Sequence, residues 1–300
     1  MMLLELSPKI NDFFIILFSI LIEGIPFILF GAFLSALVEI YFSEERVQKI
    51  LPKNRFMRFS SMVMMGNIIP VCECGNVPFA RRLISKGIKP YFVLTFLLAA
   101  PVFNPIVIAS TIAAFPNNYE IVFFRLLFTF IIAVSLGYIF MLFSSRDMLI
   151  DKLIEQRRQK IKEKNHKRHK HGFFSIIHKE FIEMTAIFLF GATIASIIQI
   201  VVPKELIFQF TQNEWIAILA MILLAFVVSI CSNVDAFFAL AYSQIFPTSA
   251  ILAFLVFGPM IDIKAIPMFK TIFKWKPLLI IIALIALLTF FLSYLYFLFT

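Results

Sequence analysis

Long runs of apolar residues set the main constraint on how this chain can fold. Six runs reach the roughly 20 residues that an α-helix needs to cross a bilayer, and they cover 12–41, 91–115, 121–143, 178–202, 250–270 and 277–299. Hydrophobic residues make up 61% of the 300 residues and charged residues 15%, whereas soluble domains average about 45–50% and about 25%. This composition excludes a soluble globular enzyme and a disordered chain. We expect an all-α, polytopic membrane protein with about six full spans.

Two further apolar stretches, 59–89 and 214–247, contain residues that break helices. The first is interrupted by Pro70, Cys72-Glu-Cys-Gly75 and Pro78, and the second by Cys231-Ser-Asn-Val-Asp235. Non-helical backbone at membrane depth is tolerated only where protein buries it or where it lines a wet cavity. Each stretch is therefore expected to be a re-entrant hairpin or a pair of short spans. The total becomes roughly eight to ten helical membrane segments.

The distribution of basic residues predicts the orientation of the chain. The region 144–177 is rich in Lys and Arg, whereas 116–120 and 243–249 contain neither. Loops rich in Lys and Arg remain in the cytoplasm, so we expect 144–177 to be a cytoplasmic linker and both termini to lie outside. The N-terminal run lacks a basic leader and a small-residue cleavage site, which favours a first span over a signal peptide.

A cluster of His, Lys and Arg occupies 166–171 within this linker. A metal-sensing role is one interpretation, because imidazole is a common metal ligand. A plain solvated linker is the other, and we favour it because neighbouring cationic side chains repel metal ions. Similarly, Arg81 and Arg82 are better explained as topology-setting residues than as an anion site.

Three pairs of similar segments recur in the same order, about 160 residues apart. Glu23-Gly-Ile-Pro-Phe-Ile-Leu-Phe-Gly-Ala32 matches 183–192, Cys72 matches Cys231, and 96–104 matches 254–262. These matches predict a first membrane repeat at 1–143, the linker at 144–177 and a second membrane repeat at 178–300. Each repeat has an odd number of crossings, so the second copy is expected to be inverted. Inverted repeats with broken helices near the midplane are a transporter architecture.

The segment Cys72-Glu73-Cys74-Gly-Asn76 contains the clearest candidates for substrate binding. Thiolates select soft ions, and the carboxylate between them adds a hard donor. The alternative is that the cysteines are small buried packing residues. The interruption by Pro and Gly favours a site, so we predict substrate contacts by Cys72, Glu73, Cys74 and Asn76, with Cys72 and Cys74 as metal ligands.

The second repeat offers Cys231 and Asn233 as further substrate-binding candidates. For Cys231 taken alone, buried packing is the simpler interpretation. Asn104 is also a substrate-binding candidate, although it could equally cap a kink between Pro101 and Pro105.

Three carboxylates lie within or beside the spans and are candidates for coupling to an ion or proton: Glu23, Asp235 and Asp262. An ionisable residue inside a membrane span suggests a functional role. The alternative for Asp262 is an ion pair with Lys264 near the cytoplasmic face.

Four motifs resemble the predicted permease family that contains the ArsP organoarsenical exporters. They are Pro70-Val-Cys-Glu-Cys-Gly with Pro78, Phe96-Leu-Leu-Ala-Ala-Pro-Val-Phe-Asn-Pro105, Cys231-Ser-Asn-Val-Asp-Ala-Phe237 and Leu252-Ala-Phe-Leu-Val-Phe-Gly-Pro-Met-Ile-Asp-Ile263. The resemblance covers nearly the whole chain. It implies a permease of the bacterial inner membrane, with Cys72 and Cys74 binding trivalent arsenicals. It also implies a second membrane protein as a partner for some members. Glu73 stands where the exporters often have Ser, which favours a cation as substrate.

The leading interpretation is a secondary transporter for a thiophilic metal or metalloid, with no enzymatic activity, cofactor or nucleic-acid partner. Its expected partners are the lipid bilayer and a small inorganic or organometalloid substrate. Three alternatives remain. One is a membrane subunit or scaffold of a larger complex, and another is an exporter specific for trivalent organoarsenicals. The third is an intramembrane thiol redox enzyme, for which Cys-x-Cys is a weaker signal than Cys-x-x-Cys.

Overall fold

The expected all-α, polytopic fold is confirmed. A computed structural model describes residues 2–41, 43, 49, 51–142, 148–150, 172–201 and 213–299, and most of these residues are helical. The His cluster at 166–171 and most of the predicted linker 144–177 lie outside the described residues.

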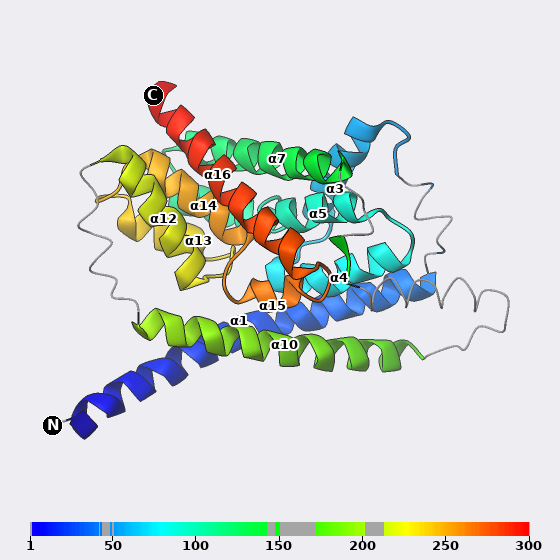
Figure 1. Ribbon diagram of the computed structural model, residues 1–300, viewed down its shortest axis with the longest axis horizontal. Coiled ribbons are helices and arrows are strands. Elements are labelled where there is room, and N and C mark those ends of the chain that lie inside the picture. Colours follow the sequence, from blue (N-terminus) through cyan, green and yellow to red (C-terminus); the bar gives the residue numbers. More distant parts are fainter. Residues whose placement is uncertain are drawn as a thin grey trace.

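Each half of the chain has the same succession of helices, in which a long helix is followed by short ones and then by a second long helix (Figure 1). In the described part of the first half, four short helices separate two long ones: α1 (Met2–Tyr41), α3 (Arg55–Ile68), α4 (Glu73–Ser85), α5 (Pro90–Ala99), α6 (Pro105–Ala114) and α7 (Tyr119–Leu142). The described second half has the same pattern: α10 (Phe173–Val201), α12 (Glu214–Val228), α13 (Asp235–Tyr242), α14 (Thr248–Met260), α15 (Ala265–Phe269) and α16 (Trp275–Phe299).

Within the described residues, four helices are long and apolar enough to cross a membrane: Lys9–Tyr41 of α1, and the whole of α7, α10 and α16. Large apolar side chains cover their outer faces; Phe14, Phe18 and Ile22 on α1 are 47%, 55% and 73% exposed. In a bilayer, such side chains face lipid, since lipid tails are as apolar as the residues themselves.

Two of the six expected spans, 91–115 and 250–270, are interrupted rather than continuous. Between α5 and α6, Pro101 and Pro105 lack the backbone N–H that a continuous helix requires. The Asn104 side chain instead caps α6 by accepting a hydrogen bond from the Ile106 N–H at 2.9 Å. Between α14 and α15, the Asp262 carboxylate accepts from the Ala265 N–H at 2.8 Å. The length of an apolar run therefore overestimated the number of unbroken spans.

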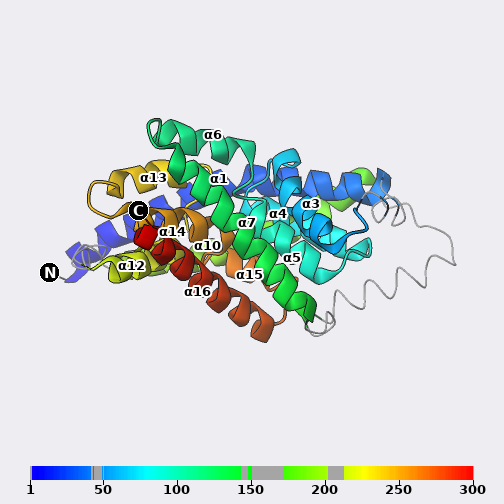
Figure 2. The ribbon, with the colours of Figure 1, turned by 90° about the horizontal axis from the view of Figure 1, so that it is seen from above.

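The long helices of the two halves run in opposite directions. In Figure 1, α1 and α7 run from the left end of the molecule toward the right, whereas α10 and α16 run from right to left. The labelled N- and C-termini consequently lie at the same end of the molecule in both ribbon views (Figures 1 and 2). Helices α1 and α10 pack directly against each other.

Two glycines let the long helices approach the interrupted segments closely. A Cβ on Gly31 of α1 would lie 2.2 Å from the carbonyl oxygen of Gly75 in α4. A Cβ on Gly191 of α10 would lie 2.5 Å from the carbonyl oxygen of Lys264, just before α15. Small residues at helix contacts are typical of membrane proteins, because they let backbones approach closely.

The short helices of one half contact those of the other in the interior. α4 packs against α15, and α13 packs against α6; α6 and α13 lie side by side in Figure 2. These two contacts bring the interrupted segments of both halves together.

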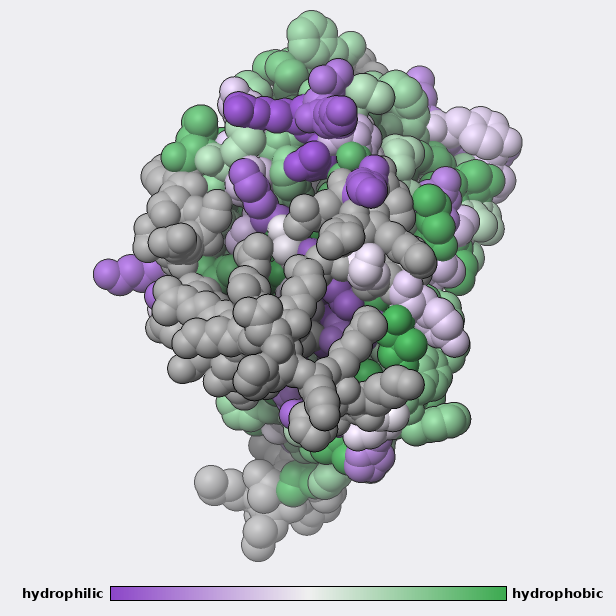
Figure 3. All heavy atoms as spheres, turned by 90° about the vertical axis from the view of Figure 1, so that its right-hand side faces the viewer, coloured by the Kyte–Doolittle hydropathy of each residue, from purple (hydrophilic) through white to green (hydrophobic). Residues whose placement is uncertain are grey.

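Hydrophilic side chains gather at one end of the molecule, the right-hand end of Figure 1, which faces the viewer in Figure 3. The described basic residues Lys53, Arg55, Lys89 and Lys179 are exposed. Lipid-facing surfaces rarely carry such charges, so an aqueous interface is the expected environment of these side chains.

Candidate functional site

The first interruption lies between Ile68, the last residue of α3, and Glu73, the first residue of α4. Pro70 prevents the helix from continuing, because it has no N–H to donate. Cys72 takes an extended backbone at the N-cap of α4, and its carbonyl accepts a hydrogen bond from the Asn76 N–H at 3.1 Å. This local sequence starts a helix inside the protein and buries its first residue, Glu73.

The second interruption repeats this arrangement. α12 ends at Val228, and Ser229 follows in the left-handed region with φ 49°. A turn from Cys231 to Val234 then leads into α13, whose first residue is Asp235. Each half therefore has a buried carboxylate at the start of a broken helix, Glu73 in α4 and Asp235 in α13.

Cys72, Glu73 and Cys231 converge in the interior. One ligand atom from each, the two Sγ atoms and a carboxylate oxygen, lie within 4.8 Å of one another. All three residues are at most 3% exposed. Thiolate and carboxylate donors together suit a soft or borderline cation such as Zn²⁺. Cys74 is also buried, but the thiol that joins Cys72 and Glu73 in this group comes from Cys231 in the other half of the chain.

Lys264 is buried beside this group and is the first functional candidate that sequence reasoning missed. Its Nζ atom lies 3.1 Å from Glu73 Oε1 and 3.3 Å from Asp262 Oδ2, and it donates to the Ser229 carbonyl at 2.7 Å. The Ser232 hydroxyl donates to the second Glu73 oxygen at 3.3 Å. Lys264 does pair with Asp262, as the alternative for Asp262 expected, and both side chains are buried in the protein, 3% and 1% exposed.

Arg125 is the second missed residue. It lies in α7, where its guanidinium donates to Asp235 Oδ2 at 2.5 Å and to the Thr111 hydroxyl at 2.7 Å. The Arg125 and Asp235 side chains are 2% and 3% exposed. The sequence feature that could have revealed Arg125 is its position inside an otherwise apolar span. Charged residues are costly in membranes and usually functional.

The remaining residues predicted from the sequence lie outside the group formed by Cys72, Glu73 and Cys231. Glu23 on α1 is half-buried and lies within electrostatic reach of Lys264 and Glu73. The Asn76 side chain is buried, and neither carboxamide atom has a hydrogen-bond partner among the described residues. Asn104 caps α6 and lies outside the Cys72 group. Asn233 is half-buried in the turn before α13.

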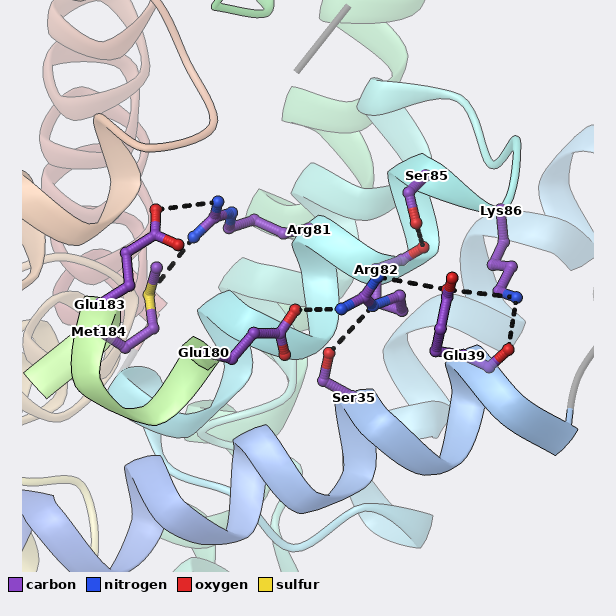
Figure 4. A network of polar contacts seen from close by, with 9 residues as sticks. All are labelled: Ser35, Glu39, Arg81, Arg82, Ser85, Lys86, Glu180, Glu183 and Met184. Atoms are coloured by element: carbon purple, nitrogen blue, oxygen red, sulfur yellow. Dashed lines mark hydrogen bonds and ion pairs between the residues drawn. The ribbon is translucent and has the colours of Figure 1, made fainter. Parts of the chain in front are cut away.

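Arg81 and Arg82 face carboxylates, and they tie α4 to the two long helices (Figure 4). Arg81 binds Glu183 of α10 at 3.1 Å. Arg82 binds Glu180 of α10 and also reaches Glu39 of α1 at 3.2 Å. Glu183, the sequence counterpart of Glu23, is therefore part of this ion-pair network.

The fold and the buried polar cluster define a multi-pass helical membrane protein with an ionisable site between its two halves. The chain belongs to the predicted permease family, whose model matches residues 9–298. This confirms the family resemblance found in the sequence motifs.

Two relatives cover most of the chain. One, from Streptococcus mutans, is named "Putative two-component membrane permease complex subunit"; it is 38% identical over 267 residues, which are 87% of each chain. The other, UPF0718 protein YcgR from Bacillus subtilis, is 37% identical over 281 residues, which are 92% of this chain and 93% of the relative. No solved structure matches the chain.

Proposed function

We propose that this protein is a secondary transporter that moves a thiophilic metal or metalloid species by alternating access. The observation that carries the proposal is the group formed by Cys72, Glu73 and Cys231, which joins the interrupted segments of both halves. Permease-family membership supports a transport role. Broken helices that meet in the interior from two halves are the usual setting of a transporter binding site.

An inverted repeat is the architecture that we propose for this transport. The first membrane repeat is 1–143, the linker is 144–177 and the second membrane repeat is 178–300. The opposite directions of α1 and α10, and of α7 and α16, support inversion. The pattern of buried and exposed positions is the same along 21–32 and 181–192, which supports equivalence of the two halves.

The positive-inside rule gives the proposed orientation. The basic linker 144–177 would be cytoplasmic, with both termini on the outer side of the bacterial inner membrane. The common location of the labelled termini at one end of the molecule supports placing both on the same side of the membrane.

The chemistry of the proposed site follows from its donors. Cys72 and Cys231 would provide soft ligands, and Glu73 would neutralise part of the charge of a cation. Cys74 remains a proposed second ligand from the same turn as Cys72. Asn76, Asn104 and Asn233 would offer polar contacts along the path. Glu23, Asp235 and Asp262 would balance charge or couple transport to an ion or proton.

Transport by the purified protein in proteoliposomes tests this function. Uptake of Cd²⁺, Zn²⁺ and trivalent methylarsenite would be measured for the wild type and for Cys72→Ser, Cys231→Ser and Cys74→Ser. We expect the first two substitutions to abolish transport of one of these species, with a smaller loss for Cys74→Ser. Full transport of every species by Cys72→Ser and Cys231→Ser would remove the thiols from the mechanism. Transport of methylarsenite alone would favour the organoarsenical exporter.

The name of the Streptococcus mutans relative favours a second candidate, a membrane subunit that needs a partner. In that case the protein alone would catalyse no flux, and flux would appear only when a second membrane protein is incorporated into the same vesicles. Complete activity of the single purified chain would exclude this candidate.

A further inference from the structure

We propose that Lys264 is an internal cation that occupies the site when no cargo is bound, and that a cargo cation displaces its ammonium group from Glu73. Lys264 then acts as a specificity-determining residue, because the cargo must compete with a fixed positive charge. This inference rests on the proposed function and identifies its substrate class as a cation rather than an anion.

The contacts of Lys264 show what it competes for. Its Nζ atom lies 3.1 Å from Glu73 Oε1, and Glu73 is also the carboxylate that lies within 4.8 Å of the Cys72 and Cys231 thiols. The same carboxylate can therefore pair with either of two positive groups, the ammonium of Lys264 or a cation bound by the thiols. Two cations near one carboxylate repel each other strongly in a buried site, so occupancy of one position disfavours the other.

The structure also provides two partners that the ammonium group already has and can keep when it leaves Glu73. Lys264 lies 3.3 Å from Asp262 Oδ2 and donates to the Ser229 carbonyl at 2.7 Å. Asp262 is itself held by the Ala265 N–H at 2.8 Å, so it remains in position when Glu73 changes partner. Lys264 can therefore leave Glu73 without becoming an unpaired buried charge, which is strongly unfavourable.

The charge balance favours cationic cargo. With their usual charges, Glu73 and Asp262 contribute −2 and Lys264 contributes +1, which leaves −1 over the three residues. A negative buried site attracts cations and repels anions. Half-buried Glu23, within electrostatic reach of Lys264 and Glu73, adds to this preference.

Two substitutions should change cation affinity in opposite directions. Lys264→Gln removes the competing charge and leaves Glu73 to the cargo, so binding becomes tighter. Asp262→Asn removes the second carboxylate partner of the ammonium group, so Lys264 remains on Glu73 and binding becomes weaker. Lys270→Gln is the matched control, because it removes the same charge from an exposed side chain that lies over the Trp275 ring.

Equilibrium binding of radioactive Cd²⁺ to the purified full-length protein in detergent tests this inference at one fixed pH. Removing a unit charge a few ångströms away changes affinity by at least about tenfold. We therefore expect Lys264→Gln to raise Cd²⁺ affinity by that factor and Asp262→Asn to lower it similarly, with Lys270→Gln like the wild type.

Four outcomes separate the inference from the proposed function. Unchanged affinity in Lys264→Gln and Asp262→Asn, or a shift of both in the same direction, overturns the role of Lys264 alone. A wild type that binds no Cd²⁺ overturns the inference, whereas the proposed function fails only if Zn²⁺ and methylarsenite are not transported either. If Lys264→Gln does not elute as a folded protein, Cd²⁺ binding by Asp262→Asn and Lys264→Arg tests the inference instead. The inference then requires weaker Cd²⁺ binding by Asp262→Asn and near wild-type binding by Lys264→Arg. Any other result overturns it.

Discussion

The buried pair of Arg125 and Asp235 leads to a quantitative prediction. Arg125 lies in α7 of the first half and Asp235 starts α13 of the second, and their side chains are 2% and 3% exposed. Removing one partner of such a pair leaves a buried charge without compensation, which costs about 3–5 kcal/mol. We expect Arg125→Gln and Asp235→Asn each to lower the free energy of unfolding by about that amount.

The double variant distinguishes a specific pair from two separate packing effects. The two substituted side chains would both be neutral amides and able to share a hydrogen bond. We therefore expect Arg125→Gln with Asp235→Asn to recover at least about 2 kcal/mol of the summed single losses. Thr111→Val is an intermediate control, because it removes one hydrogen bond to a charged group, worth about 1.5–3 kcal/mol.

Unfolding in mixed micelles of a mild detergent and dodecyl sulfate provides the measurement. Trp215 and Trp275 supply the fluorescence signal, and all four variants would be titrated under identical conditions. A double variant that is as unstable as the sum of its single variants would refute the reasoning, because the two charges would then not interact.

Two further predictions follow from the geometry. Gly31→Ala should destabilise the protein by about 1–3 kcal/mol, because a Cβ there would lie 2.2 Å from the Gly75 carbonyl oxygen. Gly172→Ala, which meets no atom within 4 Å, should be neutral in the same unfolding assay. Saturating Cd²⁺, but not Mg²⁺, should slow alkylation of Cys72 and Cys231 by N-ethylmaleimide, since thiolates prefer soft ions. Equal alkylation rates with both ions, read by mass spectrometry of peptides, would contradict thiol coordination.

The sequence located two of the helix interruptions, because their causes are local. Pro70 and the Cys72–Gly75 run predicted the break between α3 and α4, and the Cys231–Asp235 run predicted the break between α12 and α13. A proline or a turn changes the backbone within a few residues of itself, so a single segment contains enough information. The motifs also identified the family, which the family match confirmed.

The partners of the buried charges were not predictable in the same way. Arg125 and Asp235 are 110 positions apart, and Ser232 bonds Glu73 across 159 positions. Lys264 illustrates the difficulty, because the sequence suggested its pair with nearby Asp262 but not its second partner, Glu73.

The sequence by itself determined that the chain is helical, crosses a membrane and breaks its helices at particular residues, because apolar length and proline act locally. Only the tertiary structure decided that the Cys231 thiol joins Cys72 and Glu73, and that Lys264 and Arg125 neutralise the carboxylates at the start of the broken helices. The pair of Glu73 and Lys264 lies where α4 packs against α15, and Asp235 starts α13, which packs against α6. A burial cost that reaches several kcal/mol for an unpaired charge makes such pairing necessary, but it does not specify which distant residue provides the partner.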